Sequence, residues 1–239
     1  MNINLSLVES NARLDERLFL TQREYTIKHE NSLFVLESDK TFIILNYSIS
    51  LCVPYIDKPQ SGIVRISVFN HIKERGAFEK KISSTLKKIL IKSRCIDQES
   101  LCLIFNELCY SIDFSIQILE SNGNLFRFCT ELLLYSIEKI DIINELSSKY
   151  SDLMAKHILA DSEIFHNRKI LVNYQPKCFY FIQIKDKILV DPTAAEDNLK
   201  DAWFLVVMDN KNMLYLEKSG GECNIADIMS VITYCTTKS

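Results

Sequence analysis

Three carboxylates in the last third of the sequence are spaced so that they could share in chemistry. Asp191 is followed by Glu196 and Asp197, and neighbouring acidic side chains can hold a divalent metal or organise reacting oxygens. A structural role explains the same residues more simply. Asp191 precedes Pro192 at the end of an expected strand, where an aspartate accepts backbone hydrogen bonds in a turn. We therefore interpret Asp191 as a turn residue, and Glu196 with Asp197 as a solvated or helix-starting pair.

Eight cysteines and four histidines are the other groups that could bind a metal or attack a substrate. The cysteines lie mostly within apolar runs, none of them form a Cys-x-x-Cys pair, and the histidines do not join them at zinc spacing. No close Ser/His/Asp or Cys/His arrangement indicates a hydrolytic site. We expect buried free thiols in a reducing compartment, with no bound metal and no cofactor.

The composition is that of a soluble globular protein, with 47% hydrophobic and 25% charged residues in 239. No apolar run is long enough to span a bilayer, so no membrane contact is expected. The first residues lack the pattern of a secretory signal, which favours the cytosol or the nucleus. The net charge of −3 gives no general attraction to nucleic acid, so any RNA contact must come from a local basic patch.

The periodicity of the chain predicts two α/β domains, residues 1–150 and 151–239, each with a mixed sheet covered by helices. Residues 144–169, where the pattern weakens, are interpreted as the connection. In the first domain we expect helices at 5–17, 75–93 and 125–140, and strands at 33–36, 42–51, 63–69 and 110–118, with a short apolar run at 101–105. In the second domain we expect strands at 178–184, 188–190, 202–208 and 213–217, and a closing helix at 224–235.

A series of short motifs gives this pattern a family likeness. In chain order they are Arg13-Leu14-Asp15-Glu16-Arg17, a proline-bounded loop from Pro54 to Gly62, the segment Cys95 to Cys102, the turn Asn122-Gly123-Asn124, the stretch Leu189-Val190-Asp191-Pro192-Thr193, and Ser219-Gly220-Gly221. Their order and spacing resemble those of the RNase PH-type proteins that form the core ring of the eukaryotic RNA exosome. One departure is Glu16, where that family has glycine.

The resemblance implies a fold and a function. The fold would be α/β (α+β), RNase PH-like, with two mixed-sheet subdomains and a first half similar to the ribosomal protein S5 domain 2-like fold. The function would be that of a non-catalytic exosome ring subunit, which scaffolds the complex and helps to channel RNA for 3′-to-5′ processing and decay. Its partners would be other RNase PH-like ring subunits, S1/KH cap proteins, a hydrolytic nuclease and RNA, in the nucleus, the nucleolus and the cytoplasm.

Active members of the family degrade RNA by phosphorolysis, and two of their motifs differ here. A Gly-Ser/Thr-Arg run that grips phosphate corresponds to Asn124, Leu125 and Phe126, and Arg127, one position later, would point about 100° away on a helix. The family's Asp-x-Asp corresponds to Asp191-Pro192-Thr193, so the second acid is lost. We therefore expect no catalysis by this chain. The alternative is a phosphorolytic 3′-to-5′ exoribonuclease subunit that contributes to a composite active site in a heterodimer.

The same resemblance points to residues for RNA and for assembly. Lys58 lies in a loop that borders the channel in ring relatives, while Lys73, Arg75 and Lys88 lead into or lie on the first long helix. A lysine face of this kind would bind phosphates without sequence preference, but for any single lysine the solvated side of an amphipathic helix is the simpler interpretation. Lys58 and Arg75 are the better candidates for RNA. Two roles stay open for Arg13, Asp15 and Arg17. They form either an ion-paired network tying the N-terminal arm to a neighbouring subunit, with Asp191 as a further structural residue, or exposed charges worth under ~1 kcal/mol.

Overall fold

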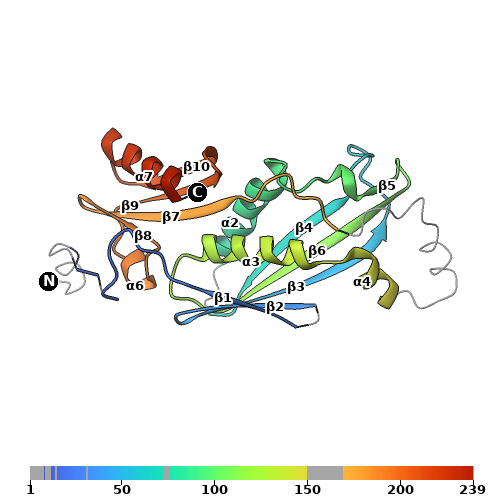
Figure 1. The fold of residues 1–239 in the computed structure, drawn as a ribbon, viewed down its shortest axis with the longest axis horizontal. Helices are drawn as coiled ribbons and strands as arrows, with labels where there is room; N and C mark the ends of the chain where they lie inside the picture. The colour runs from blue at the N-terminus through green and yellow to red at the C-terminus, as the bar shows by residue number, and fades with distance from the viewer. Residues whose placement is uncertain are drawn as a thin grey trace.

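The structure is a computed structural model that describes residues 8, 12–13, 15–30, 32–72, 76–149 and 169–238. Figure 1 shows two β-sheets at opposite ends of an elongated molecule, with helices between them and beyond the second sheet. The first sheet has the order β1-β2-β3-β6-β4, with β5 pairing with β6. Its strands are β1 (Thr26–Glu30), β2 (Leu33–Ser38), β3 (Thr41–Cys52), β4 (Ile63–Asn70), β5 (Cys102–Ile104) and β6 (Leu108–Glu120).

The first sheet is mixed, as predicted, because β4 runs parallel to β6 while the other pairs are antiparallel. Strand β6 lies at its centre and has the clearest alternation of the chain. Phe114 and Ile116 are buried on the inner face, and Asp113 and Ser115 are half-exposed on the outer face. This two-residue period fixes which face of the sheet packs on the helices.

Two helices cover the inner face of the first sheet. They are α2 (Gly76–Lys87), which continues as a π-helical turn at Lys88–Lys92, and α3 (Leu125–Lys139). A 3-10 turn follows at Glu99–Leu101, and α4 (Ile142–Lys149) follows α3. Helix α3 is buried nearly all round because it also packs against the second sheet. That position explains its lack of a polar face.

The second sheet has the order β10-β9-β7-β8. Its strands are β7 (Lys177–Ile184), β8 (Lys187–Val190), β9 (Ala202–Asp209) and β10 (Asn212–Gly220), and its helices are α6 (Ala194–Asp197) and α7 (Ile225–Lys238). Every pairing in this sheet is antiparallel, so the prediction of a second mixed sheet is wrong in that detail. The reason is local, because the two-residue turns 185–186 and 210–211 join neighbouring strands as hairpins.

The two sheets share one apolar core. One face of β7, including Tyr180 and Ile182, packs with the residues of α3 and of the first sheet. The other face, including Phe179 and Phe181, forms a smaller cluster with α7. The layers are therefore sheet, helices, sheet and helix, and the junction of the two predicted domains is itself part of the interior.

Most of the predicted elements are present, with ends that differ by a few residues. The expected helix at 5–17 is wrong over part of its length, since Val8 is helical but residues 12–13 and 15–17 have no helical structure. Strand β1 was not predicted because its sequence, Thr-Ile-Lys-His-Glu, is polar and lies mostly exposed at the edge of the sheet. The predicted boundary at 150/151 falls in residues 150–168, outside the described part of the chain. None of the helices described combines the length and apolar character needed to cross a membrane.

Candidate functional site

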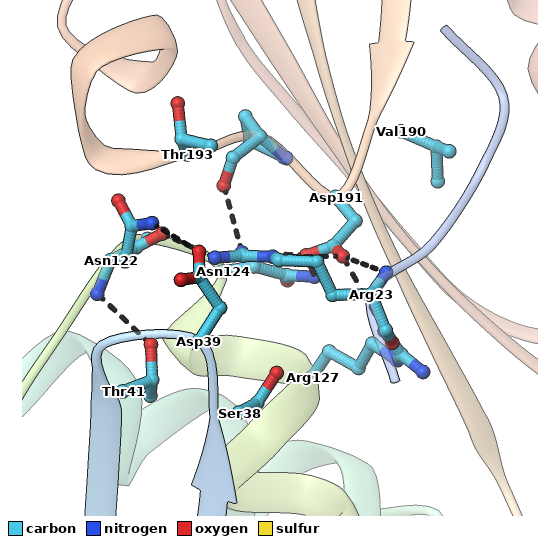
Figure 2. A network of polar contacts seen from close by, with 12 residues as sticks. Arg23, Ser38, Asp39, Thr41, Asn122, Asn124, Arg127, Val190, Asp191 and Thr193 are labelled. Carbon is cyan, nitrogen blue, oxygen red and sulfur yellow. Dashed lines mark hydrogen bonds and ion pairs between the residues drawn. The ribbon is translucent and has the colours of Figure 1, made fainter. Parts of the chain in front are cut away.

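Asp191 lies at the centre of a buried polar network where β8 ends (Figure 2). Its side chain is 0% exposed, and its backbone has a left-handed φ of 52°. Arg23 approaches it from the segment before β1. The guanidinium donates from Nη2 to Oδ1 at 2.8 Å and from Nε to Oδ2 at 3.1 Å, and the Arg23 backbone N–H donates to Oδ2 at 2.6 Å. The carboxylate is thus held by a two-point ion pair of the strongest kind.

The turn before α3 supplies a further donor to the same carboxylate. Asn124, directly before the helix, has a φ of 51° and donates from Nδ2 to Asp191 Oδ1 at 2.6 Å. Gly123 has a φ of 87°, and a Cβ placed there would lie 2.5 Å from the carbonyl oxygen of Pro192. The Asn-Gly-Asn turn therefore allows the backbone of the first domain to touch the segment that follows β8.

Two more arginines lie close to Asp191. Arg17 donates from Nη1 to Oδ2 at 3.2 Å and from Nη2 to the Asp191 carbonyl oxygen at 2.9 Å. Arg127 of α3 lies 3.7 Å from Oδ2 and donates to the carbonyl oxygen of Arg23 at 3.1 Å. Burial by itself would raise the pKa of Asp191, but the hydrogen bonds and charge of Arg23 outweigh it and hold that pKa below its usual value. Asp191 is therefore ionised in the folded chain at neutral pH.

A second buried ion pair joins the N-terminal arm to α6. Arg13 donates to Glu196 from Nε at 2.9 Å and from Nη2 at 2.7 Å, and both side chains are 0% exposed. Arg13 also donates to the carbonyl oxygens of Val190 and Asp191, each at 3.0 Å. Glu196 in turn forms a capping box with Thr193 at the start of α6. One glutamate thus starts the helix and fixes the arm against it.

This arrangement is suited to holding segments of the chain together. The Asp191 oxygens accept hydrogen bonds from arginine and asparagine, and no group of three His, Cys, Asp or Glu side chains in the described residues could hold a metal. The side chains next to the turn are apolar and buried. Leu125 and Phe126 are each 6% exposed, and the Phe126 ring packs against the rings of Tyr180 and Trp203. The site has the character of a structural clamp.

The structure brings together the four residues that were singled out as a structural or interface motif. Asp15 accepts from Arg17 Nε at 2.7 Å, and although burial would raise its pKa, the hydrogen bond and charges of Arg17 and Arg13 lower it. All the partners found for Arg13, Asp15, Arg17 and Asp191 belong to this same chain, and contact with a neighbouring subunit stays a prediction. Asp191 does accept a backbone hydrogen bond, from Arg23 N–H.

Sequence reasoning missed three members of the network. Glu196 was expected to be solvated or to start a helix. It does start α6, but the solvated interpretation is wrong because Arg13 pairs with it in the interior. Arg23 was not singled out, since it stands alone in a polar segment without a motif. Asn124 was noted only as part of a turn, and the left-handed backbone that such turns demand was its one local signal.

The predicted RNA-binding residues are not gathered into one site. Lys58 is exposed and lines a cavity of about 490 Å³ together with Lys92 and Arg94. Lys88 is exposed too, but its Nζ lies 3.4 Å from the hydroxyl of Tyr215 on β10. Lys73 and Arg75 lie outside the described residues. Asp97 and Glu99 line the same cavity, so the surface around Lys58 carries both signs of charge.

Solved exosome core structures share this fold. An archaeal exosome core matches with a TM-score of 0.82 and 17% identity, over 98% of this chain and 92% of the other. The exosome of Archaeoglobus fulgidus, solved with RNA bound to its active site, matches with a TM-score of 0.77 and 17% identity, over 98% and 94% of the two chains. The predicted RNase PH-like fold of an exosome core protein is confirmed.

Curated proteins that are similar to this chain include exosome components named RRP45. The exosome complex component RRP45 of Bos taurus is 24% identical over 91% of this chain and 51% of its own length, and that of Danio rerio is 24% identical over 91% and 57%. The RRP45A component of Arabidopsis thaliana is 24% identical over 96% and 78%. No family model matches the chain. The chain spans about half the length of the vertebrate relatives, and the likeness to exosome ring subunits inferred from the motifs is confirmed. RRP45 is also the member that the Pro54-to-Gly62 loop and the Cys95-to-Cys102 segment favour within the family.

Proposed function

We propose that the chain is a ring subunit of an RNA exosome that performs no phosphorolysis itself. It would scaffold the complex and help to channel RNA for 3′-to-5′ processing and decay. Its partners would be other RNase PH-like subunits, S1/KH cap proteins and a hydrolytic nuclease, in the nucleus, the nucleolus and the cytoplasm. The names of its curated relatives and the order of its motifs support this assignment.

The proposed lack of catalysis rests on the burial and ion pairing of Asp191. An acid that takes part in phosphoryl transfer must reach a metal or a reacting oxygen. The Asp191 carboxylate is 0% exposed and is paired with Arg23 within the chain. The positions that correspond to the phosphate-gripping hydroxyl and guanidinium are Leu125 and Phe126, both packed in the core. Neither half of a phosphorolytic site is therefore available on this chain.

A phosphorolysis assay tests the assignment directly. The purified chain, incubated with RNA and inorganic phosphate, should release no nucleoside diphosphates, because it can hold neither phosphate nor a reactive acid. Co-purification from cells, with the partners identified by mass, should recover RNase PH-like ring subunits. Release of nucleoside diphosphates by the chain alone would overturn the non-catalytic assignment, and recovery of the chain without ring subunits would overturn the scaffold.

The same assay, performed on a heterodimer, distinguishes the non-catalytic proposal from the composite-site alternative. A dimer of this chain with its ring neighbour would be compared with a dimer whose neighbour carries a substitution in its own Asp-x-Asp motif. Under the proposal, substitution of the acid in the neighbour's motif abolishes all phosphorolytic activity. Substitutions on the surface of this chain leave the rate of an assembled dimer unchanged. A surface substitution here that lowers the rate without weakening assembly would support the composite site instead.

A further inference from the structure

Three cysteines occupy adjacent strands at one end of the first sheet. Cys52 is the last residue of β3 and is the register partner of Cys109 on β6, and Cys109 is also the register partner of Cys102 on β5. All three are free thiols. The proposed scaffold and RNA-channel roles make no use of them, and they lie at the end of the first sheet that is remote from β8 and the Asp191 network (Figure 1).

The pair formed by Cys52 and Cys109 has the geometry from which a disulfide can form. Their sulfur atoms are 3.6 Å apart. Directly opposed residues on antiparallel strands have Cα atoms about 4.5–5.5 Å apart, which lies within the range of about 4.4–6.8 Å found for disulfides. Because Cys52 ends its strand and residues 53–62 form a loop, the backbone there can follow a small side-chain rotation that brings the sulfurs into bonding distance.

We propose that Cys52 and Cys109 are a redox-sensitive pair that forms a reversible disulfide with a small-molecule disulfide such as glutathione disulfide as oxidant. The Cys52 thiolate attacks one sulfur of glutathione disulfide, a mixed disulfide forms, and glutathione leaves as a thiolate that takes a proton from solvent. Cys109 then gives up its proton and attacks the Cys52 sulfur, which releases the second glutathione. Two cysteine sulfurs are oxidised, the two glutathione sulfurs are reduced, and one protein disulfide is made.

The surroundings of the sulfurs set the order of these steps. Cys52 is half-buried and can meet an oxidant in solution, whereas Cys109 is 0% exposed. Burial, followed by the hydrogen bond and charge of Cys52, raises the pKa of Cys109 to about 12, which suits the resolving thiol better than the attacking one. Cys102 has a different partner, since its Sγ lies 3.7 Å from the carbonyl oxygen of Pro59. Cys52 therefore reacts first and Cys109 resolves the mixed disulfide.

The bond would act on the loop that follows Cys52. This loop, residues 53–62, runs from the end of β3 to β4 and is held against the β5–β6 turn by the Asn106 N–H, which donates to Pro59 O at 3.0 Å. A covalent link at Cys52, the residue directly before the loop, fixes one end of the loop that carries Lys58. The inference stands on the cysteines alone and does not depend on the proposed exosome function.

Peptide mapping of the purified full-length chain tests the proposal. The chain would be equilibrated with a series of reduced-to-oxidised glutathione ratios, alkylated, digested and analysed by mass spectrometry. At oxidising ratios we expect loss of two hydrogen atoms, a linked pair of peptides containing Cys52 and Cys109, and full reversal on reduction. Alkylation of both cysteines at every ratio, or a bond from either of them to Cys102, would overturn the inference.

Matched serine variants identify the pair. Cys52→Ser should abolish the linked peptides, whereas Cys102→Ser and Cys223→Ser should leave them unchanged. Cys223 is a suitable control because it is also half-buried and lies in the second domain. Mapping on the unsubstituted chain decides the outcome even if a variant folds poorly. Persistence of the oxidised mass in Cys52→Ser would contradict the assignment.

Discussion

Arg23 and Asp191 are separated by 168 residues in the sequence and form a two-point ion pair in the interior of the folded chain (Figure 2). The pair joins the segment before β1 to the end of β8, at the junction of the two sheets. Removing two charges from water is costly, so a buried pair of this kind specifies which segments meet more than it adds net stability. The clamp therefore positions the N-terminal arm and the second sheet relative to each other.

Asp191→Asn should be strongly destabilising. The change leaves Arg23, Arg17 and Arg127 around a neutral group in the interior, and loss of one partner from a buried pair costs about 3–5 kcal/mol. The free energy of unfolding would be measured by urea titration. Asp113→Asn is the matched control, because Asp113 pairs with Arg65 at side-chain exposures of 41% and 50%, and an exposed pair is worth under about 1 kcal/mol. Equal losses in both variants would contradict the clamp.

The stabilisation by Asp191 should disappear in acid. Its folded-state pKa is held below the usual value of an aspartate, so its contribution is complete above the unfolded pKa, about 3.9, and is lost as the pH falls through the lower folded pKa. The difference in unfolding free energy between the wild type and Asp191→Asn should be constant from pH 7 to about pH 5 and shrink below about pH 4. Urea titrations at each pH would measure it. A difference that does not change down to pH 2 would show that Asp191 stabilises the fold by packing and not by charge.

The elements of the fold could be predicted because their signals are local. The alternation along β6 and the apolar stripe of α2 can each be recognised within a short stretch of sequence. The segment before β1 is different, because residues 15–25 have no regular structure. Its conformation is set by hydrogen bonds from Arg13 to Glu196 and from Arg17 to Asp191. A helix was predicted nearby because nothing within the segment indicates bonding to residues so far along the chain. Strand β1 was not predicted for a related reason. An exposed edge strand has no buried face, so its apolar and polar residues do not alternate.

The candidate site was predictable only in part. Asp191 was recognised as a hydrogen-bond acceptor at a turn, and a backbone N–H does bind it. The burial of Glu196 could not be inferred, because it depends on Arg13, 183 residues away. Likewise, the burial of Phe126 could not be inferred, because the rings that surround it come from the second sheet. Periodicity gives faces and spacing within an element, while the pairing of charges between elements requires the assembled structure.

Gly123→Ala should weaken the contact between the turn before α3 and the segment after β8. Gly123 has a φ of 87°, and its added Cβ would meet Pro192 O at 2.5 Å and Thr193 C at 2.8 Å. Because a left-handed, sterically closed position strains any side chain, we expect a loss of about 1–3 kcal/mol in unfolding free energy. Gly221→Ala is the control, since its Cβ would meet its nearest neighbour at 3.4 Å. If thermal and urea unfolding showed equal changes for both variants, the close approach at Gly123 would be disproved.

Charge reversal around Lys58 should weaken RNA binding by an assembled ring. Lys58, Lys92 and Arg94 line one cavity together with Asp97 and Glu99, and cations that bind phosphates give an affinity that falls with salt. In Lys58→Glu/Lys92→Glu we expect weaker RNA protection and a smaller slope of log affinity against log salt, by about 0.7 for each phosphate of a single strand that is no longer neutralised.

The control, Lys28→Glu/Lys211→Glu, changes the net charge equally at exposed lysines that do not line this cavity. Its salt slope should match that of the unsubstituted ring. An unchanged slope and unchanged protection in the Lys58/Lys92 variant would remove this surface from the path of the RNA, and an equal decrease in both variants would show that only net charge matters.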